Sequence, residues 1–249
     1  MQLRNNRFLF VQIVTMLVLL ISCTKQEAKL VANQQTDFSN SSIVQVYLAT
    51  VNASRNYIYV DAAQVTGGLM SSGSVFPSGG ATIGANIQPG LRAFLIRDTL
   101  STTTQVPFTF AQNMQVGNRY TIFIYDTITA PKQKTVQTDI IIPADTTARL
   151  RFANFVHSKN AVPAVDIFAK RRNINLFTNV AVTDVTSFIP VPSSFNDTII
   201  VREAGTTNQL AVLNGLNPTQ KRSYTVVFRG SYAITSGTNA RTVSSFTNY

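Results

Sequence analysis

The feature that most constrains the fold of this 249-residue chain is an internal repeat at a nearly constant spacing. Five blocks of similar sequence recur at offsets of 104 to 107 residues. The aligned blocks are 45–56 with 149–160, 60–61 with 165–166, 94–98 with 199–203, 119–123 with 223–227, and 134–136 with 241–243. Self-similarity at a fixed period indicates that one structural unit has been duplicated. We therefore expect two tandem domains, over residues 43–143 and 148–249, with the junction at 143–147.

Both copies carry the residue pattern of β-strands. Polar or amphipathic residues alternate with apolar ones in 45–48 and 149–152, which is the period of a strand with one buried face. Runs of β-branched and aromatic residues occur at 57–60, 94–96, 120–125, 140–142, 199–201 and 224–228. Turn signals separate these runs, and no segment of ten residues after residue 22 keeps a helical period.

About seven short strands in about 100 residues are typical of an immunoglobulin-like sandwich. The sequence therefore predicts an all-β protein with two tandem Ig-like antiparallel β-sandwich domains. Because the junction has only five residues, we expect the two sandwiches to touch or nearly touch. One stretch breaks the symmetry: 66–84 contains six of the twelve Gly, whereas its counterpart 170–184 has none. This stretch is either an inserted surface loop or a mobile binding loop on a rigid scaffold.

The second copy resembles a known family. Residues 155–168 read Phe-Val-His-Ser-Lys-Asn-Ala-Val-Pro-Ala-Val-Asp-Ile-Phe, which is similar to the signature V-H-[AG]-S-x-x-A-P-x-V-D-V/I-Y/F of the bacterial "domain of unknown function 4397" family. Residues 179–188 and 210–228 resemble its later blocks, so the likeness covers most of 148–247. The chain departs from the family at Val162 and 193–195, and the first copy matches much less well. The resemblance implies a small β-sandwich, often in tandem, of secreted proteins and lipoproteins, and it implies no activity.

The N-terminus has the layout of a bacterial lipoprotein signal. Arg4 and Arg7 precede a nearly unbroken apolar run over 8–21, which is shorter than the roughly 20 residues a membrane span needs. The run ends in Leu-Ile-Ser-Cys at Cys23, the single Cys of the chain, and this resembles a lipobox. We expect residues 1–22 to be a signal peptide, Cys23 to be lipidated, and 23–42 to be a flexible tether. The alternative is a transmembrane anchor with a chance Cys.

The residue after the lipidated Cys bears on location. In Gram-negative lipoproteins that stay in the inner membrane, an Asp directly after the lipidated Cys is the typical retention signal. This chain has Thr24 at that position. We therefore expect anchoring in the outer membrane, facing either the periplasm or the exterior. Several acyl chains together give stable anchoring, whereas one chain anchors only marginally.

The composition excludes most catalytic and metal chemistry. With 45% hydrophobic residues the chain can bury a core, and its single Cys excludes internal disulfides and Cys-based zinc sites. The single His, His157, is expected to make a structural hydrogen bond at a strand end, with a ligand, metal or catalytic contact as the alternatives. The acids Asp61, Asp166, Asp98 and Glu203 are expected to make strand-end or turn contacts, and Arg97 and Arg202 stand beside the last two. We expect no catalytic residues, cofactor or metal.

The charge of the chain bears on its partners. The net charge is +10, but the basic residues are scattered in short groups. An exported lipoprotein rarely meets nucleic acid, so solvated surface or contact with anionic envelope material is favoured. The chain has no Trp for stacking on sugars, although eight Tyr remain. The sequence predicts a non-enzymatic outer-membrane lipoprotein, an interaction or adhesion module that contacts the membrane through its lipid and another envelope protein or glycan. The alternative is a glycan-binding accessory lipoprotein.

Overall fold

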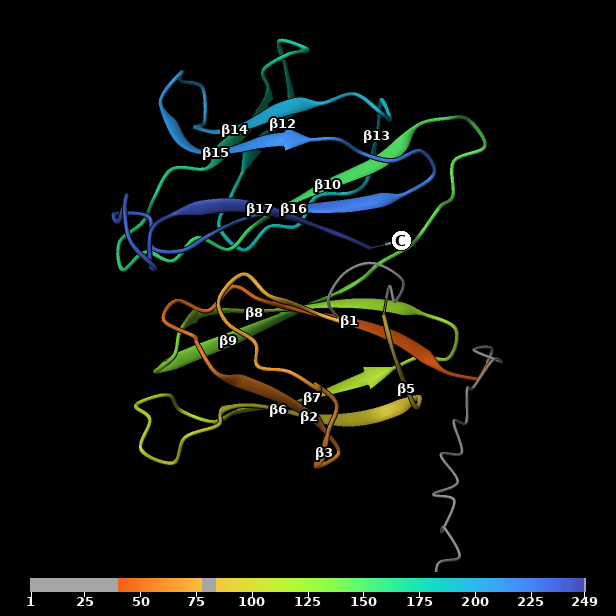
Figure 1. Cartoon of the computed structure of the whole chain (residues 1–249), viewed down its shortest axis with the longest axis vertical. Coiled ribbons are helices and arrows are strands. Elements are labelled where there is room, and N and C mark those ends of the chain that lie inside the picture. Colours follow the sequence, from red (N-terminus) through yellow and green to blue (C-terminus); the bar gives the residue numbers. More distant parts are fainter. Residues whose placement is uncertain (1–39, 78–83, 249) are drawn as a thin grey trace, which may run out of the picture. The chain divides into compact units, whose positions relative to one another are not determined.

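The computed structural model describes residues 40–77 and 84–248, and their regular secondary structure consists of β-strands in four sheets. The predicted all-β sandwich architecture is confirmed. The predicted signal peptide, the lipidation at Cys23 and almost all of the tether lie outside the described residues, as does the 78–83 part of the Gly-rich stretch. Figure 1 shows the strands of each repeat arranged in two layers.

The described residues of the first repeat form nine strands in two sheets. One sheet has the order β4-β1-β8-β9, with β5 also pairing with β1, and the other has the order β3-β2-β6-β7. Their bounds are β1 (Ser42–Leu48), β2 (Asn56–Val60), β3 (Ala63–Gln64), β4 (Val75–Phe76), β5 (Ala85–Ile87), β6 (Gly90–Asp98), β7 (Phe108–Met114), β8 (Arg119–Thr127) and β9 (Ala130–Gln137).

The second repeat contains eight strands with the same connectivity. Its sheets have the orders β13-β10-β16-β17 and β12-β11-β14-β15. Their bounds are β10 (Ala148–Asn154), β11 (Val165–Ala169), β12 (Ile174–Val180), β13 (Ile189–Val191), β14 (Asp197–Glu203), β15 (Gln209–Leu216), β16 (Ser223–Arg229) and β17 (Thr242–Thr247).

The strand order refines the immunoglobulin comparison. In an Ig constant domain the first two strands lie in the same sheet, whereas here β1 and β2, like β10 and β11, lie in different sheets. The sheets are also not purely antiparallel, because β1 pairs parallel with β8 and β10 pairs parallel with β16. Each repeat therefore has one mixed sheet and one antiparallel sheet.

The strand registers correct two sequence-based expectations. Val60 pairs with Phe94 in the first repeat, and Ala169 pairs with Ile199 in the second. Phe94 and Ile199 are repeat equivalents, so Val60 corresponds to Ala169, and the alignment of 60–61 with 165–166 is wrong. The reason is that the connection leading into β11 is longer than the one leading into β2.

The β-branched run at 140–142 is the second correction, because it is not a strand. It lies in the connection between β9 and β10, where Ile141 is 69% exposed. High strand propensity reflects packing on a pleated surface, and this segment pairs with no strand.

Each repeat has its own hydrophobic core between its two sheets. Alternating residues of β1 and β8, such as Val46 and Ile122, point into the first core beside Phe94. Phe152 of β10 and Phe228 of β16 occupy the second core. Period-two alternation thus places one face of each mixed sheet inside its own sandwich.

The opposite faces of the two mixed sheets form a third core between the repeats. Its buried members are Tyr47, Ala49, Phe123, Ala153, Phe155, Val227 and Phe246. The Phe123 and Phe155 rings stack with centroids 4.6 Å apart, and those of Tyr47 and Phe246 with centroids 5.2 Å apart. The sandwiches are therefore in contact, as expected, and the described residues 40–77 and 84–248 belong to one compact unit. We call this junction of the two mixed sheets the seam.

Candidate ligand-binding cleft

His157 lies on the seam and contacts the other repeat. Its Nδ1 atom is 2.9 Å from Oδ1 of Asp126, and these two side chains are 18% and 16% exposed. Oδ2 of Asp126 is 2.8 Å from Nζ of Lys132, and this contact raises the pKa of Lys132. The sequence singled out His157 but gave no sign that its partner lies in the first repeat. The imidazole therefore joins the two repeats by a polar contact.

The acids that the sequence singled out make strand-end contacts, as expected. Asp61 accepts hydrogen bonds from Arg92 and from the Ala93 backbone N–H. Asp166 accepts from the backbone N–H groups of Asn179 and Gly205. Glu203 accepts from the side-chain amide of Asn208 at 3.0 Å. Asp166 and Glu203 both bond to the 204–208 turn, but Asp166 pairs with Arg202 and Val165 with Glu203, so the two carboxylates lie on opposite faces of the sheet.

The neighbouring arginines take no part in these contacts. Successive side chains of a strand point to opposite faces, so Arg97 and Arg202 point away from Asp98 and Glu203. Their guanidinium groups instead lie over aromatic rings, Arg97 over Tyr59 at 4.9 Å and Arg202 over Phe168 at 3.5 Å.

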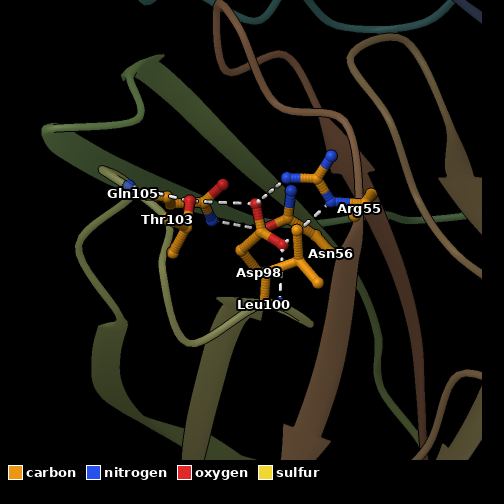
Figure 2. Close-up of polar contacts among 6 residues, drawn as sticks. All are labelled: Arg55, Asn56, Asp98, Leu100, Thr103 and Gln105. Atoms are coloured by element: carbon orange, nitrogen blue, oxygen red, sulfur yellow. Dashed lines mark hydrogen bonds and ion pairs between the residues drawn. The ribbon is translucent and has the colours of Figure 1, made fainter.

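Figure 2 shows how Asp98 organises the connection between β6 and β7. Its carboxylate accepts hydrogen bonds from the Leu100 N–H and the Thr103 hydroxyl, both at 3.0 Å, and from Nη2 of Arg55 at 3.2 Å. Burial alone would raise the pKa of Asp98, but these hydrogen bonds outweigh it and hold the pKa below its ordinary value. Gln105 extends the network by donating to the side-chain oxygen of Asn56 at the start of β2. The network fixes a loop, and among the described residues it brings no second carboxylate to Asp98.

Neither a metal cluster nor a membrane-spanning helix occurs in the described part of the chain. Within 40–77 and 84–248, no three His, Cys, Asp or Glu side chains gather in a way that could hold a metal ion. The described part of the chain also has no helix long and apolar enough to cross a bilayer.

A polar cleft of about 710 Å³ lies at one end of the seam. The first repeat lines it with Asn52, Ala53, Ser54, Ser71 and Ser72, and the second with Arg229 and residues 235–242. These residues supply seven hydroxyl groups, two side-chain amides and two guanidinium groups, and no carboxylate. The cleft therefore offers many hydrogen-bonding groups from both repeats together with a positive charge. Two of the lining residues, Ser71 and Ser72, come from the Gly-rich stretch.

Arg229 at the end of β16 connects the cleft to the seam. Its Nε donates to the Tyr47 hydroxyl at 3.1 Å, and its Nη1 donates to the Ser72 hydroxyl at 3.1 Å. Burial raises the pKa of Tyr47 although Arg229 lies beside it, so the phenol is neutral and accepts this bond. Gly73 covers the guanidinium with a backbone φ of +91°, and a Cβ atom there would overlap it. A side chain at position 73 would therefore be strained by the positive φ and would displace the Arg229 guanidinium from its place over the cleft.

Sequence reasoning missed Tyr47, Arg229 and Arg151. The signal was present in the strand pattern, because the faces of β1 and β10 that alternate with the core carry Tyr47 and Arg151. Tyr and Arg side chains occur on solvent-exposed strand faces, and they occur equally well on strand faces that are buried against another sheet. The pattern alone therefore did not distinguish an exposed face from a seam.

Similarity to known proteins adds no functional assignment. No protein-family model matches the chain, and no curated protein matches it either. Hydroxyl, amide and guanidinium groups bind polyhydroxylated or anionic ligands through directed hydrogen bonds.

Proposed function

We propose that this protein is a non-enzymatic lipoprotein of the bacterial outer membrane, in which two joined sandwiches act as an interaction or adhesion module. The third core between the repeats is the observation that carries this proposal, because it turns a tandem pair into one compact unit with a surface built from both repeats. The lipobox-like end at Cys23 supports the lipid anchor. The family resemblance over 155–168 supports membership in a group of secreted and lipid-anchored sandwiches.

The use of the polar side chains supports a role without catalysis. Asp126 holds His157 through Nδ1, as an acid orients a catalytic His, but among the described residues no hydroxyl or thiol bonds to the imidazole, and Asp98 is engaged by the loop that it holds. General acid–base or nucleophilic catalysis needs such groups to converge on a position that a substrate can occupy. The partners proposed are the membrane, through the lipid, and another envelope protein or an envelope glycan, with no role for nucleic acid.

Replacement of the lipidated residue tests the anchor. We expect Cys23→Ala to release the protein from the membrane fraction or to leave it as an unprocessed precursor, because no acyl chains are then attached. Fractionation and intact-mass measurement from the native host report both outcomes. Thr24→Ser, which keeps the Cys, is the matched control and should remain membrane-bound. Normal processing and unchanged membrane association of Cys23→Ala would contradict the proposal.

The second candidate function is that of a glycan-binding accessory lipoprotein, and the polar cleft specifically favours it. Its volume of about 710 Å³ lies within the size range of small-molecule binding sites. Its hydroxyl and amide groups match the hydrogen-bonding needs of sugar hydroxyls, and Arg229 and Arg241 favour sugars that carry an anionic group.

A glycan array with the mature lipoprotein separates the two functions. We expect cleft binding to be saturable and to weaken by at least about tenfold in Ser236→Trp, because the new ring fills an exposed part of the lining. Ser101→Trp makes the same substitution in an exposed loop outside the cleft and should bind normally. Absence of binding by the folded protein, or equal loss in both variants, would end the glycan role and leave the protein-interaction role.

A further inference from the structure

A second cavity beside the seam contains a buried positive charge. Its volume is about 360 Å³, and it lies between the end of the first repeat and the 185–188 loop of the second. Val136 and Ile141 line it from one side, and Val185, Ser187 and Phe188 from the other, with Arg151 of β10 between them. It shares no lining residue with the polar cleft, so it is a separate site.

Arg151 is held by neutral groups from both repeats. The residue is 3% exposed. Its Nε donates to the Thr225 hydroxyl at 2.8 Å, and its Nη2 donates to the hydroxyls of Thr121 at 2.8 Å and Thr138 at 3.2 Å. The Phe188 ring covers the guanidinium, with its centroid 4.7 Å from Cζ.

The charge of Arg151 has no counter-charge among the described residues, where no carboxylate lies within ion-pair distance of it. Burial lowers the pKa of Arg151 to about 9, which is still above neutral pH, so the side chain carries its charge. A buried ion is costly unless an opposite charge or additional hydrogen bonds compensate it. The seam does not require a cation here, because neutral Gln45 occupies the equivalent position in the first repeat, where it pairs with Thr121 as Arg151 pairs with Thr225.

The hydrogen-bond count leaves one end of the guanidinium for a ligand. A guanidinium has five N–H donors, and the contacts above use the one on Nε and the two on Nη2. The two on Nη1 have no acceptor among the described residues. Arg151 lines the cavity of about 360 Å³, so these two donors are available to a ligand there.

We propose that this cavity binds a small organic monocarboxylate. One carboxylate oxygen accepts hydrogen bonds from Nη1 of Arg151, and the apolar body of the ligand packs against Val136, Val185 and Phe188. A single cation and a partly apolar lining suit a monoanion with a hydrophobic group better than a phosphate dianion, whose second charge would remain uncompensated. The Ser187 hydroxyl, which is exposed at the cavity, is placed to donate to the ligand.

Asp139 provides a sensitive check on the sign of the ligand charge. It also lines the cavity, and its carboxylate is exposed and accepts a hydrogen bond from Gln137 at 2.9 Å. This negative charge repels an anionic ligand. Replacing it with the neutral Asn therefore strengthens the binding of a carboxylate and leaves the binding of a neutral isostere unchanged.

The test uses benzoate, its neutral isostere benzamide, and inorganic phosphate as probes on the mature protein, with titration calorimetry and thermal unfolding as readouts. We expect saturable binding of benzoate, a several-fold higher affinity in Asp139→Asn, and loss of binding in Arg151→Met. Because Arg151→Met also alters the seam, Ser187→Trp supplies a second variant that fills the cavity and leaves the contacts of Arg151 in place. It too should lose benzoate while remaining folded.

Three results would overturn the proposal. The first is a folded protein that shows no saturable benzoate binding. The second is equal binding of benzamide or phosphate, which would remove the requirement for a monocarboxylate. The third is benzoate binding that persists in Ser187→Trp, which would place the ligand elsewhere.

Discussion

Phe123→Ala is expected to lower the free energy of unfolding by about 3–5 kcal/mol, the usual loss for truncating a fully buried Phe. Phe123 is 0% exposed and lies in the third core, where its ring stacks on Phe155 of the second repeat. Its loss leaves a cavity between two sandwiches that are each intact inside. The expected result is therefore a weaker connection between the repeats, seen in denaturant unfolding as two transitions in place of one.

Phe94→Ala is the matched control for this prediction. Phe94 is also buried, at 1% exposed, but it lies inside the first repeat. Hydrogen exchange distinguishes the two variants: Phe123→Ala should raise exchange in β10 and β16 of the second repeat, whereas Phe94→Ala should raise it mainly in β2 and β6. A loss below about 1 kcal/mol in Phe123→Ala, where a buried Phe should cost several, would contradict a shared core. So would unchanged protection of the second repeat.

Gly230→Ala is expected to cost about 2–5 kcal/mol of stability, because strain and overlap add at this position. Gly230 is buried with a backbone φ of +90°, and a Cβ atom would overlap the carbonyl oxygen of Ala240. That oxygen belongs to the backbone, so the loop over 231–241 must move as a whole. Since this loop lines the polar cleft, ligand binding at the cleft should weaken in the same variant.

Gly237→Ala is the control that separates strain from overlap. Gly237 also has a positive φ, +85°, but no atom would lie within 4 Å of the added Cβ. Gly237→Ala should therefore lower the stability only by the backbone strain of a positive φ, which is about 1–2 kcal/mol. Thermal unfolding of the two variants gives the difference directly. Equal losses would show that the approach of Gly230 to Ala240 is not a structural requirement.

The polar sites show why part of the molecule was beyond sequence reasoning. His157 was identifiable as the single imidazole, but its partner Asp126 is supplied by a different repeat. Arg151 and Arg229 belonged to a diffuse set of basic residues, and their burial depends on surfaces far away in the chain. Tyr47 bonds to Ser244, and Gln45 bonds to Asn248, across separations of 197 and 203 residues. No local pattern encodes such pairs.

The sequence by itself determined the class of strands and the duplication, because both are local or periodic properties. Alternation of polar and apolar residues with period two sets which residues share a face of a strand, and a constant offset shows that the set occurs twice. The tertiary structure alone decided which strands pair in parallel, where β11 begins relative to β2, and that the second faces of β1 and β10 are buried. A strand pattern predicts which residues share a face of the strand. Whether that face is buried depends on the docking of another sheet. Here that docking formed the seam, the polar cleft and the cavity of Arg151.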